Sequence, residues 1–282
     1  MRFVWLLGPC IAACAFNPAG LPGVDGDAAS DGAGGDDGGG RADAGADAPG
    51  DAASPDAPPV DAGGDPFCAV DSPLACFRMN QATGGPIDGA SPPLGTLRGD
   101  GATYAPGCHG RALALGAGVY VRTAEPTPPL RELSVSAWVK LDAPPAPGDT
   151  GVHYWFDGEE EWGLSYVADP AAGTIEIRCT MLRNVTENAA TARATVPSLT
   201  TWTHLACSYD RGKVRLFVAG TKYEVNPSDA DLIDVDHNGI QLGRDGVDQA
   251  TGYVDGLIDD VRLWDHRVAD AVLTADAAIP CD

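Results

Sequence analysis

The fold is decided by residues 204–218, whose sequence is HLACSYDRGKVRLFV. Residues 204–209 and residues 213–218 each alternate between apolar and polar side chains, which is the period of a strand with one buried face. Asp210-Arg211-Gly212 lies between them and is short enough for a hairpin turn. The stretch therefore predicts two antiparallel strands joined by a tight turn.

Similar patterns recur on both sides of this hairpin. Strand-forming residues dominate residues 133–139 (LSVSAWV), 174–179 (TIEIRC), 239–243 (GIQLG) and 257–264 (LIDDVRLW). Only residues 268–278 have a helix-like composition, and the 36 Gly and 23 Pro favour turns over long helices. We therefore predict an all-β domain over residues 68–282, built as a two-sheet antiparallel jelly-roll sandwich.

The N-terminus has the pattern of an export signal. Arg2 precedes a short apolar stretch, and residues 11–14 (IAAC) are similar to a bacterial lipobox, in which small residues precede the cysteine that becomes lipidated. We predict a lipoprotein signal peptide over residues 1–13 and lipidation at Cys14. An ordinary secretory signal cut nearby is the alternative. Lipidation would place the exported protein at the outer membrane or the cell surface.

Residues 14–67 have a different composition from the rest of the chain. Residues 17–66 contain 11 Asp, a single Arg and no aromatic residue. Such a segment buries too little apolar surface to offset the entropy of ordering it, and its like charges repel one another. We predict a disordered acidic linker that tethers the folded domain.

The net charge restricts the partners of the protein. The 282 residues carry 40 Asp and Glu against 18 Lys and Arg, for a formal charge of −22. A field of this sign repels phosphate, which argues against nucleic acid and anionic membrane surfaces as partners. No run of 18 apolar residues exists, so we expect contact with the membrane only through the lipid anchor.

The domain resembles the laminin G-like, concanavalin A-like jelly rolls of bacterial surface proteins. The similar segments follow one another in order: residues 74–80 (LACFRMN), 110–115 (GRALAL), 134–140 (SVSAWVK), 202–206 (WTHLA), 209–210 (YD), 214–220 (VRLFVAG) and 256–264 (GLIDDVRLW). This order along nearly the whole domain is specific for the fold. It says little about the ligand, because one fold serves many functions.

Six cysteines fall in the domain, and an even number in an exported chain suggests three disulfides with fifteen possible connectivities. The resemblance places the strands of Cys179 and Cys207 side by side, which favours the pair Cys179–Cys207. It also brings the jelly-roll termini together, which favours Cys68–Cys281 and leaves Cys76–Cys108. A zinc site is the alternative, but the domain has no C-x-x-C pair.

The sequence argues against an enzyme. Related laminarinase-type jelly rolls use paired acids in the pattern E-x-D-x-x-E, which this chain lacks, and it also lacks G-x-S-x-G. Glu159-Glu160-Glu161 is the only Glu cluster, and we interpret it as a solvated loop. His204 lies in a strand where the family has a structural histidine, so we expect it in the core.

Calcium is the only cofactor that the sequence suggests. The resemblance places Asp259 where related jelly rolls coordinate a structural ion, with Asn80 on the opening strand and Asp88 as further oxygen ligands. A second candidate loop contains Asp234, Asp236, Asn238 and Asp245, in a spacing close to that of an EF-hand loop. Its acid at the last position is Asp rather than Glu, and a strand pattern follows it, so a polar turn between strands is the alternative.

Aromatic side chains that stack on sugar rings are the other binding signal. Trp155 and Trp162 flank the acidic loop and are the candidate platform, although either could instead pack in the sheet. Trp138, Trp202 and Trp264 lie in strand patterns and are expected in the core. We predict a non-catalytic, envelope-anchored binding module for a glycan or for an envelope or extracellular protein. The alternatives are a purely structural spacer domain and, third, a glycoside hydrolase.

Overall fold

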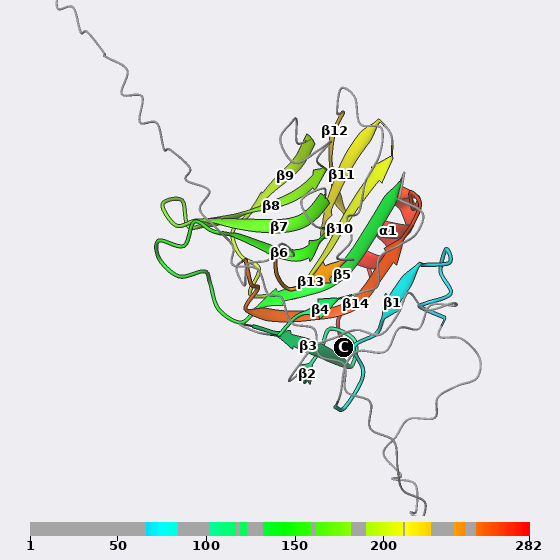
Figure 1. Cartoon of the computed structure of the whole chain (residues 1–282), viewed down its shortest axis with the longest axis horizontal. Helices are drawn as coiled ribbons and strands as arrows, with labels where there is room; N and C mark the ends of the chain where they lie inside the picture. Colours follow the sequence, from blue (N-terminus) through cyan, green and yellow to red (C-terminus); the bar gives the residue numbers. More distant parts are fainter. Residues whose placement is uncertain are drawn as a thin grey trace, which may run out of the picture. The chain divides into compact units, whose positions relative to one another are not determined.

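The structure is a computed structural model that describes residues 66–83, 102–116, 119–122, 132–158, 162–181, 190–210, 212–226, 240–245 and 252–282. All of these residues belong to one compact unit, Pro59–Asp282. They form two antiparallel sheets, as predicted, and a single short helix, α1 (Asp270–Ala277), among the described residues (Figure 1). The predictions for residues 1–65, including the signal peptide, Cys14 and most of the linker, lie outside the described residues.

The first sheet has eight strands. They are β1 (Ala75–Phe77), β2 (Thr103–Pro106), β3 (Arg111–Leu115), β5 (Leu133–Leu141), β10 (Thr203–Asp210), β11 (Lys213–Val218), β12 (Thr221–Val225) and β14 (Gly256–Trp264). Their order is β12-β11-β10-β5-β14-β3-β2, and β1 pairs with β14 beside this path. The predicted hairpin is β10–β11, in which Asp210 pairs with Lys213 across the turn.

The second sheet has six strands. They are β4 (Val121–Arg122), β6 (Val152–Asp157), β7 (Trp162–Asp169), β8 (Thr174–Met181), β9 (Ala190–Val196) and β13 (Gln241–Leu242). Their order is β4-β13-β6-β7-β8-β9, so β6 to β9 form a meander. The strands β8 and β9 lie close to β11 and β12 of the first sheet, where the edges of the two sheets meet.

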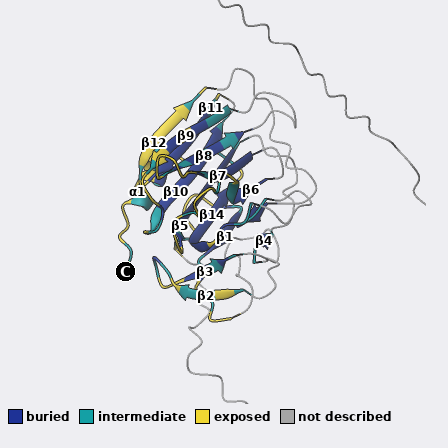
Figure 2. Cartoon of the chain, turned by 90° about the vertical axis from the view of Figure 1, so that its left-hand side faces the viewer, coloured by how far each residue is buried: buried dark blue, intermediate teal, exposed yellow. Residues whose placement is uncertain are grey.

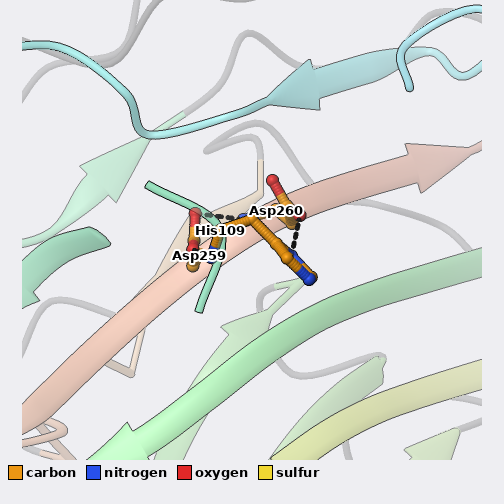
Figure 3. A group of neighbouring side chains, drawn as sticks. All are labelled: His109, Asp259 and Asp260. Carbon is orange, nitrogen blue, oxygen red and sulfur yellow. Dashed lines mark hydrogen bonds and ion pairs between the residues drawn. The ribbon is translucent and has the colours of Figure 1, made fainter. Parts of the chain in front are cut away.

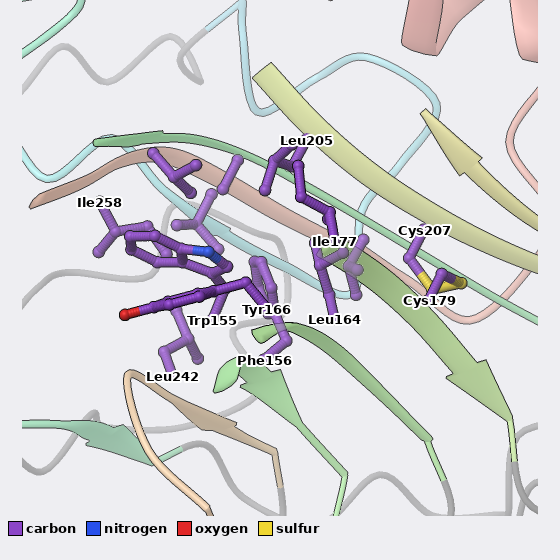
Figure 4. Packing of buried hydrophobic residues seen from close by; sticks show 14 of the residues in the cluster. Trp155, Phe156, Leu164, Tyr166, Ile177, Cys179, Leu205, Cys207, Leu242 and Ile258 are labelled. Carbon is purple, nitrogen blue, oxygen red and sulfur yellow. A yellow bond between two sulfur atoms is a disulfide. The ribbon is translucent and has the colours of Figure 1, made fainter. Parts of the chain in front are cut away.

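The hydrophobic core lies between the two sheets. Val135, Ala137 and Val139 alternate along β5 toward the core, and Ile175 and Ile177 do so along β8. The period of two in each strand places one side chain in two inside, which is why the alternating sequence pattern predicted the sandwich. Figure 4 shows the aromatic part of this core.

The outer face of the eight-stranded sheet is covered in part by α1. Leu273 of the helix packs with Val268, Trp264, Phe217 and Ala206 in a second apolar cluster. The burial view shows the central strands of both sheets as buried and β12 as the exposed edge (Figure 2). Among the described residues, no helix combines the length and apolar character that a membrane crossing requires.

The closing strand β14 contains a β-bulge. Its register against β5 shifts between Asp259 and Arg262, and Asp260 adopts a positive φ of 47°. Before the bulge, Gly256–Ile258 pair with β3, whereas after it Val261–Leu263 pair with β1. The bulge therefore lets one strand serve two short partners, and it aims the side chains of two consecutive Asp residues toward one loop.

The structure contains three disulfides, Cys68–Cys76, Cys108–Cys281 and Cys179–Cys207. The predicted pair Cys179–Cys207 is confirmed, but β8 and β10 belong to different sheets, so this bond joins the sheets face to face (Figure 4).

The predicted pairs Cys68–Cys281 and Cys76–Cys108 are wrong. Cys68 precedes β1 by a short turn that folds back onto Cys76, which leaves Cys108 for the C-terminal cysteine. The C-terminal tail is held at the β2–β3 turn, where the Asp282 N–H also donates to the Cys108 carbonyl at 2.9 Å.

Candidate functional site

The outer face of the six-stranded sheet is polar. Its strands alternate, so the residues between the core positions point away from the core. The pairing register aligns them in two rows across the sheet. We call these rows together the polar face: Arg122, Gln241, Asp157, Gly163, Thr180 and Thr191 in one row, and Tyr154, Ser165, Arg178 and Arg193 in the next.

Tyr154 supplies an aromatic ring in this face. The ring lies against Gly163 on the neighbouring strand, so close that a Cβ atom added to this glycine would come within 3.0 Å of Tyr154 Cε1. Burial, together with the charges of Asp157 and Asp245, raises the pKa of Tyr154 to about 12, and nearby Arg178 opposes this shift. The hydroxyl therefore stays protonated at neutral pH and can donate a hydrogen bond.

An ion-pair group adjoins the ring. Arg178 Nε and Arg193 Nη1 both donate to Glu176 Oε1, each at 2.6 Å. Burial alone would raise the pKa of Glu176, but the hydrogen bonds from the two arginines outweigh it and hold the pKa below its ordinary value. The carboxylate is thus kept ionised and fixes both guanidinium groups in place.

A hollow of about 440 Å³ lies beside this group. Its lining consists of Thr150, Val167, Ala168, Asp169, Pro170, Thr174, Glu176, Arg178 and Thr195. A second hollow of about 310 Å³, lined in part by Pro144, Pro145 and Pro197, shares Ala168, Asp169, Pro170 and Thr174 with the first. The two hollows are therefore neighbours, and their volumes are in the range that ligand sites have.

The predicted aromatic platform of Trp155 and Trp162 is wrong. The two side chains are buried, with exposed fractions of 0% and 2%, and Trp155 lies among the core side chains in Figure 4. The register shift between Tyr154 and Phe156 explains this for Trp155, because the extra residue of a bulge lets two consecutive side chains face inward. The same bulge leaves Tyr154 on the outside.

Sequence reasoning missed the polar face, although part of its signal was present. Glu176, Arg178 and Thr180 alternate with Ile175, Ile177 and Cys179, so the polar side of β8 could have been recognised as a surface. Nothing in the sequence locates the bulge that selects Tyr154. Nor does it show that β6, β7 and β9 present their polar residues in register with β8.

A second cluster joins His109, Asp259 and Asp260, whose ligand-type atoms all lie within 4.8 Å of one another (Figure 3). The Asp259 carboxylate accepts the His109 N–H at 3.0 Å on Oδ2 and the Asp260 N–H at 2.8 Å on Oδ1. Asp260 pairs with His109 Nδ1 at 2.7 Å and with Arg78 Nη1 at 2.8 Å.

Burial shifts the acids of this cluster. It raises the pKa of Asp259 to about 7, helped by the negative charge of Asp260. It also raises the pKa of Asp260, although Arg78 and His109 oppose the shift. A carboxyl group with such a pKa is typical of functional sites, but Asp259 is fully buried and its oxygens contact backbone N–H groups, which is a structural role.

The predicted calcium ligands Asn80 and Asp259 both accept hydrogen bonds from backbone N–H groups at the β2–β3 turn. Asn80 Oδ1 accepts the Arg111 N–H at 2.8 Å, while Asp259 holds His109, and Asp88 lies outside the described residues. In this arrangement the donor set does not fit calcium, because N–H donors occupy both oxygens of Asp259, and the His109 ring and the Arg78 guanidinium face Asp260. Calcium binding here stays a prediction, and the function proposed below does not depend on it.

The remaining predicted residues divide into described and undescribed ones. Asp245 is half-buried beside the polar face, whereas Asp234, Asp236 and Asn238 lie outside the described residues, as does the Glu159–Glu161 cluster. His204 is buried against Trp138, and burial lowers its pKa to about 3, so the ring is neutral. Trp138 and Trp264 are buried as expected, and Trp202 is partly exposed.

The two-sheet sandwich and its polar sheet face define a jelly roll of the lectin type. The family model described as the concanavalin A-like lectin/glucanases superfamily, of laminin G type, matches residues 115–272. The chain therefore belongs to this family, and the resemblance inferred from the sequence is confirmed. A search of curated proteins found no match.

Solved structures agree on the fold. One similar structure is domain 4 of AbnA, a GH43 extracellular arabinanase from Geobacillus stearothermophilus, in complex with arabinotriose. Its sequence is 20% identical to this chain, and the TM-score is 0.56. The match covers 74% of this chain and 98% of that chain.

Two toxin domains are also similar. The binding domain of Paraclostridial Mosquitocidal Protein 1 is 10% identical, with a TM-score of 0.56 over 73% of this chain and 52% of that one. The binding domain of botulinum neurotoxin DC, in complex with rat synaptotagmin II, is 11% identical, with a TM-score of 0.55 over 73% and 51%. This chain spans about half the length of those toxin domains.

Proposed function

We propose that this chain is a non-catalytic binding module that holds a glycan or a protein ligand on the polar face. The observation that carries the proposal is the exposed part of this face: Arg178, Thr180, Thr191 and Arg193 lie in two aligned rows and are partly or fully exposed, and the ring of Tyr154 lies on Gly163. Sugar hydroxyls need several donors and acceptors at fixed spacing, and a sugar ring packs on an aromatic ring. A sheet supplies both on a rigid base.

The similar structures support this class of function. The arabinanase domain is in complex with arabinotriose, and two of the toxin structures are named as binding domains. Another structure of the botulinum neurotoxin DC binding domain is in complex with SialylT, and the present fold makes up about half of that chain. These likenesses are of fold, and the ligand of the present chain follows from its own residues.

Two of the described acids, Glu176 and Asp259, fit a non-catalytic role. Hydrolysis of a glycosidic bond needs one carboxyl group with a raised pKa as the acid. Glu176 in the hollow has a lowered pKa, because it is hydrogen-bonded to two arginines. Asp259 has a raised pKa, but it is fully buried on the outer side of the other sheet, away from the polar face.

The anchoring part of the proposal rests on the sequence. A lipid on Cys14 would hold the protein at the outer membrane or the cell surface, and residues 14–67 would act as the tether. Cys14→Ser should move the full-length protein from the membrane fraction to the soluble exported fraction. An unchanged membrane fraction would contradict lipidation at this residue, and unlipidated cleavage would support the secretory alternative.

The binding proposal is tested with the mature, disulfide-bonded protein on a panel of immobilised glycans and extracellular proteins. Tyr154→Ala should weaken binding about tenfold or more, since aromatic contacts of this kind contribute about 1–3 kcal/mol. Tyr223→Ala is the matched control, because Tyr223 is 37% exposed on β12 of the other sheet.

Three outcomes would contradict the binding proposal or its site. No binding by a folded protein would favour the structural spacer. Equal loss in both Tyr variants would move the site away from the polar face. Release of reducing ends from a bound glycan would show hydrolase activity.

A further inference from the structure

The two arginines of the polar face share one carboxylate oxygen. Arg178 and Arg193 are direct partners in the β8–β9 register, and both donate to Glu176 Oε1. Arg178 uses Nε for this bond and Arg193 uses Nη1. The shared acceptor therefore holds two guanidinium groups side by side on neighbouring strands.

This sharing leaves hydrogen-bond donors free. Within the described part of the chain, no other partner binds the two terminal nitrogens of Arg178 or the Nε and Nη2 of Arg193. Glu176 Oε2 is likewise without a partner there. Two positive groups against one negative group give a local charge of +1, on a chain whose total formal charge is −22.

The group is open to a ligand. The side chains of Glu176, Arg178 and Arg193 are 32%, 27% and 50% exposed. Glu176 and Arg178 line the 440 Å³ hollow together with Thr150, Thr174 and Thr195. Asp169 also lines it, but its Oδ1 accepts the N–H groups of Ala171 and Ala172, so this acid is engaged with its own turn.

We propose that Arg178, which lines this hollow, and its neighbour Arg193 bind the carboxylate of an acidic saccharide, such as a uronic or a sialic acid. The inference rests on the function proposed above and names its ligand class. A guanidinium fork matches a carboxylate with two parallel N–H···O bonds, which a neutral hydroxyl cannot accept. The surrounding threonines and Glu176 Oε2 offer several donors and acceptors close together, which suits the closely spaced hydroxyls of one sugar ring.

The test uses the mature disulfide-bonded protein and ligand pairs that differ only in the acid. Oligogalacturonide and sialyllactose are each compared with their own methyl ester, so the two pairs distinguish the two sources of carboxylate. We expect at least one acid to bind about tenfold or more tightly than its neutral counterpart, because hydrogen bonds to charged groups contribute about 1.5–3 kcal/mol. The difference should shrink as salt is added.

Variants then show which residues cause the preference for the acidic ligand. Arg178→Gln should weaken binding of the acid about tenfold and leave the neutral ligand within about twofold. Arg178→Lys should recover only part of the loss, because it keeps the charge but not the fork. Glu176→Gln should strengthen acid binding about two- to fivefold, since it removes the competing carboxylate. Arg111→Gln is the control, because Arg111 is an exposed arginine on β3 of the other sheet.

The outcomes separate the two proposals. Equal binding of acid and neutral ligand, or acid binding that Arg178→Gln leaves unchanged, overturns the carboxylate site while the glycan-binding function stands. Binding of poly-glutamate with the same dependence on Arg178, and of no saccharide, replaces the saccharide with an acidic peptide. Binding of no ligand on the wider panel overturns the proposed function together with this site.

Discussion

The disulfide Cys108–Cys281 should contribute more to stability than either of the other two. It joins residues 173 positions apart, whereas Cys179–Cys207 and Cys68–Cys76 join residues 28 and 8 positions apart. A cross-link stabilises a protein mainly by reducing the entropy of the unfolded chain, and this effect grows with the logarithm of the loop length. The perturbation that tests it is a pair of Cys→Ala substitutions for each bond.

The loop lengths set the expected magnitudes. The chain-entropy relation gives about 5 kcal/mol for the Cys108–Cys281 loop, about 3.5 kcal/mol for the Cys179–Cys207 loop and about 2.5 kcal/mol for the Cys68–Cys76 loop. For a domain of this size, a loss of about 5 kcal/mol corresponds to a fall in Tm of roughly 10–20 °C. Removal of the bond between the β2–β3 turn and the C-terminal tail should therefore be the most damaging of the three.

The assay is urea unfolding of each double Ala variant, followed by tryptophan fluorescence and extrapolated to water. Cys108→Ala with Cys281→Ala is compared with Cys68→Ala with Cys76→Ala, because the second pair closes a short loop and serves as the control. Cys179 and Cys207 are both fully buried between the sheets, whereas each of the other two pairs contains one fully buried cysteine, Cys76 or Cys108. Removal of Cys179–Cys207 therefore leaves the largest packing defect. That pair is therefore interpreted separately.

The loop-entropy argument is refuted if the stability losses of the variants do not follow the loop lengths. If the Cys68–Cys76 variant loses as much stability as the Cys108–Cys281 variant, loop entropy does not govern the contribution of these bonds. The local contacts around each cysteine would then decide it. A change in the urea m-value of one variant would point instead to an altered unfolded state.

Three further predictions concern single residues. Gly163→Ala should displace the ring of Tyr154 and weaken ligand binding, with a change in unfolding free energy of at most about 1 kcal/mol by urea titration; unaltered binding would exclude Tyr154 from the site. Because Asp259 has a folded pKa of about 7, above the unfolded value, the folded state binds the extra proton, so stability should fall as pH rises from about 4 to 7. Asp259→Asn should reduce this pH dependence of the unfolding free energy, measured by urea titration between about pH 4 and 7. An unchanged pH dependence would show that other groups cause the fall in stability. The calcium site predicted from the sequence should raise the Tm relative to EDTA, and Asp259→Asn should abolish the rise; an unchanged Tm would contradict the site and agree with the N–H partners that the Asp259 oxygens have in the structure.

The sequence was sufficient for the fold because strand alternation is a local signal. The hairpin of β10 and β11 needed only residues 204–218, and the closing strand β14 was equally clear. The disulfides were harder, because pairing depends on how strands are arranged in space. Neighbouring strands were expected for Cys179 and Cys207, yet they proved to lie in opposite sheets.

The candidate site was less predictable than the fold. A bulge at Trp155 reverses which aromatic residue of β6 faces outward, and no local pattern marks a bulge. Arg178 and Arg193 are 15 positions apart in the chain and meet only through the β8–β9 register. Asn80 and Asp259 are likewise far apart in the chain, and only the structure shows that they accept backbone N–H groups at the β2–β3 turn.

The bond between the two sheets also has a mechanical consequence. Arg178 of the polar face and Cys179 are consecutive residues of β8, and Cys179 is covalently bound to Cys207 in the centre of the opposite sheet. A pull on a ligand held by Arg178 would therefore be carried through a covalent bond into β10, rather than by the hydrogen bonds between β8 and its neighbours alone. A domain so constructed could resist a long polymer under flow without losing an edge of its sheet.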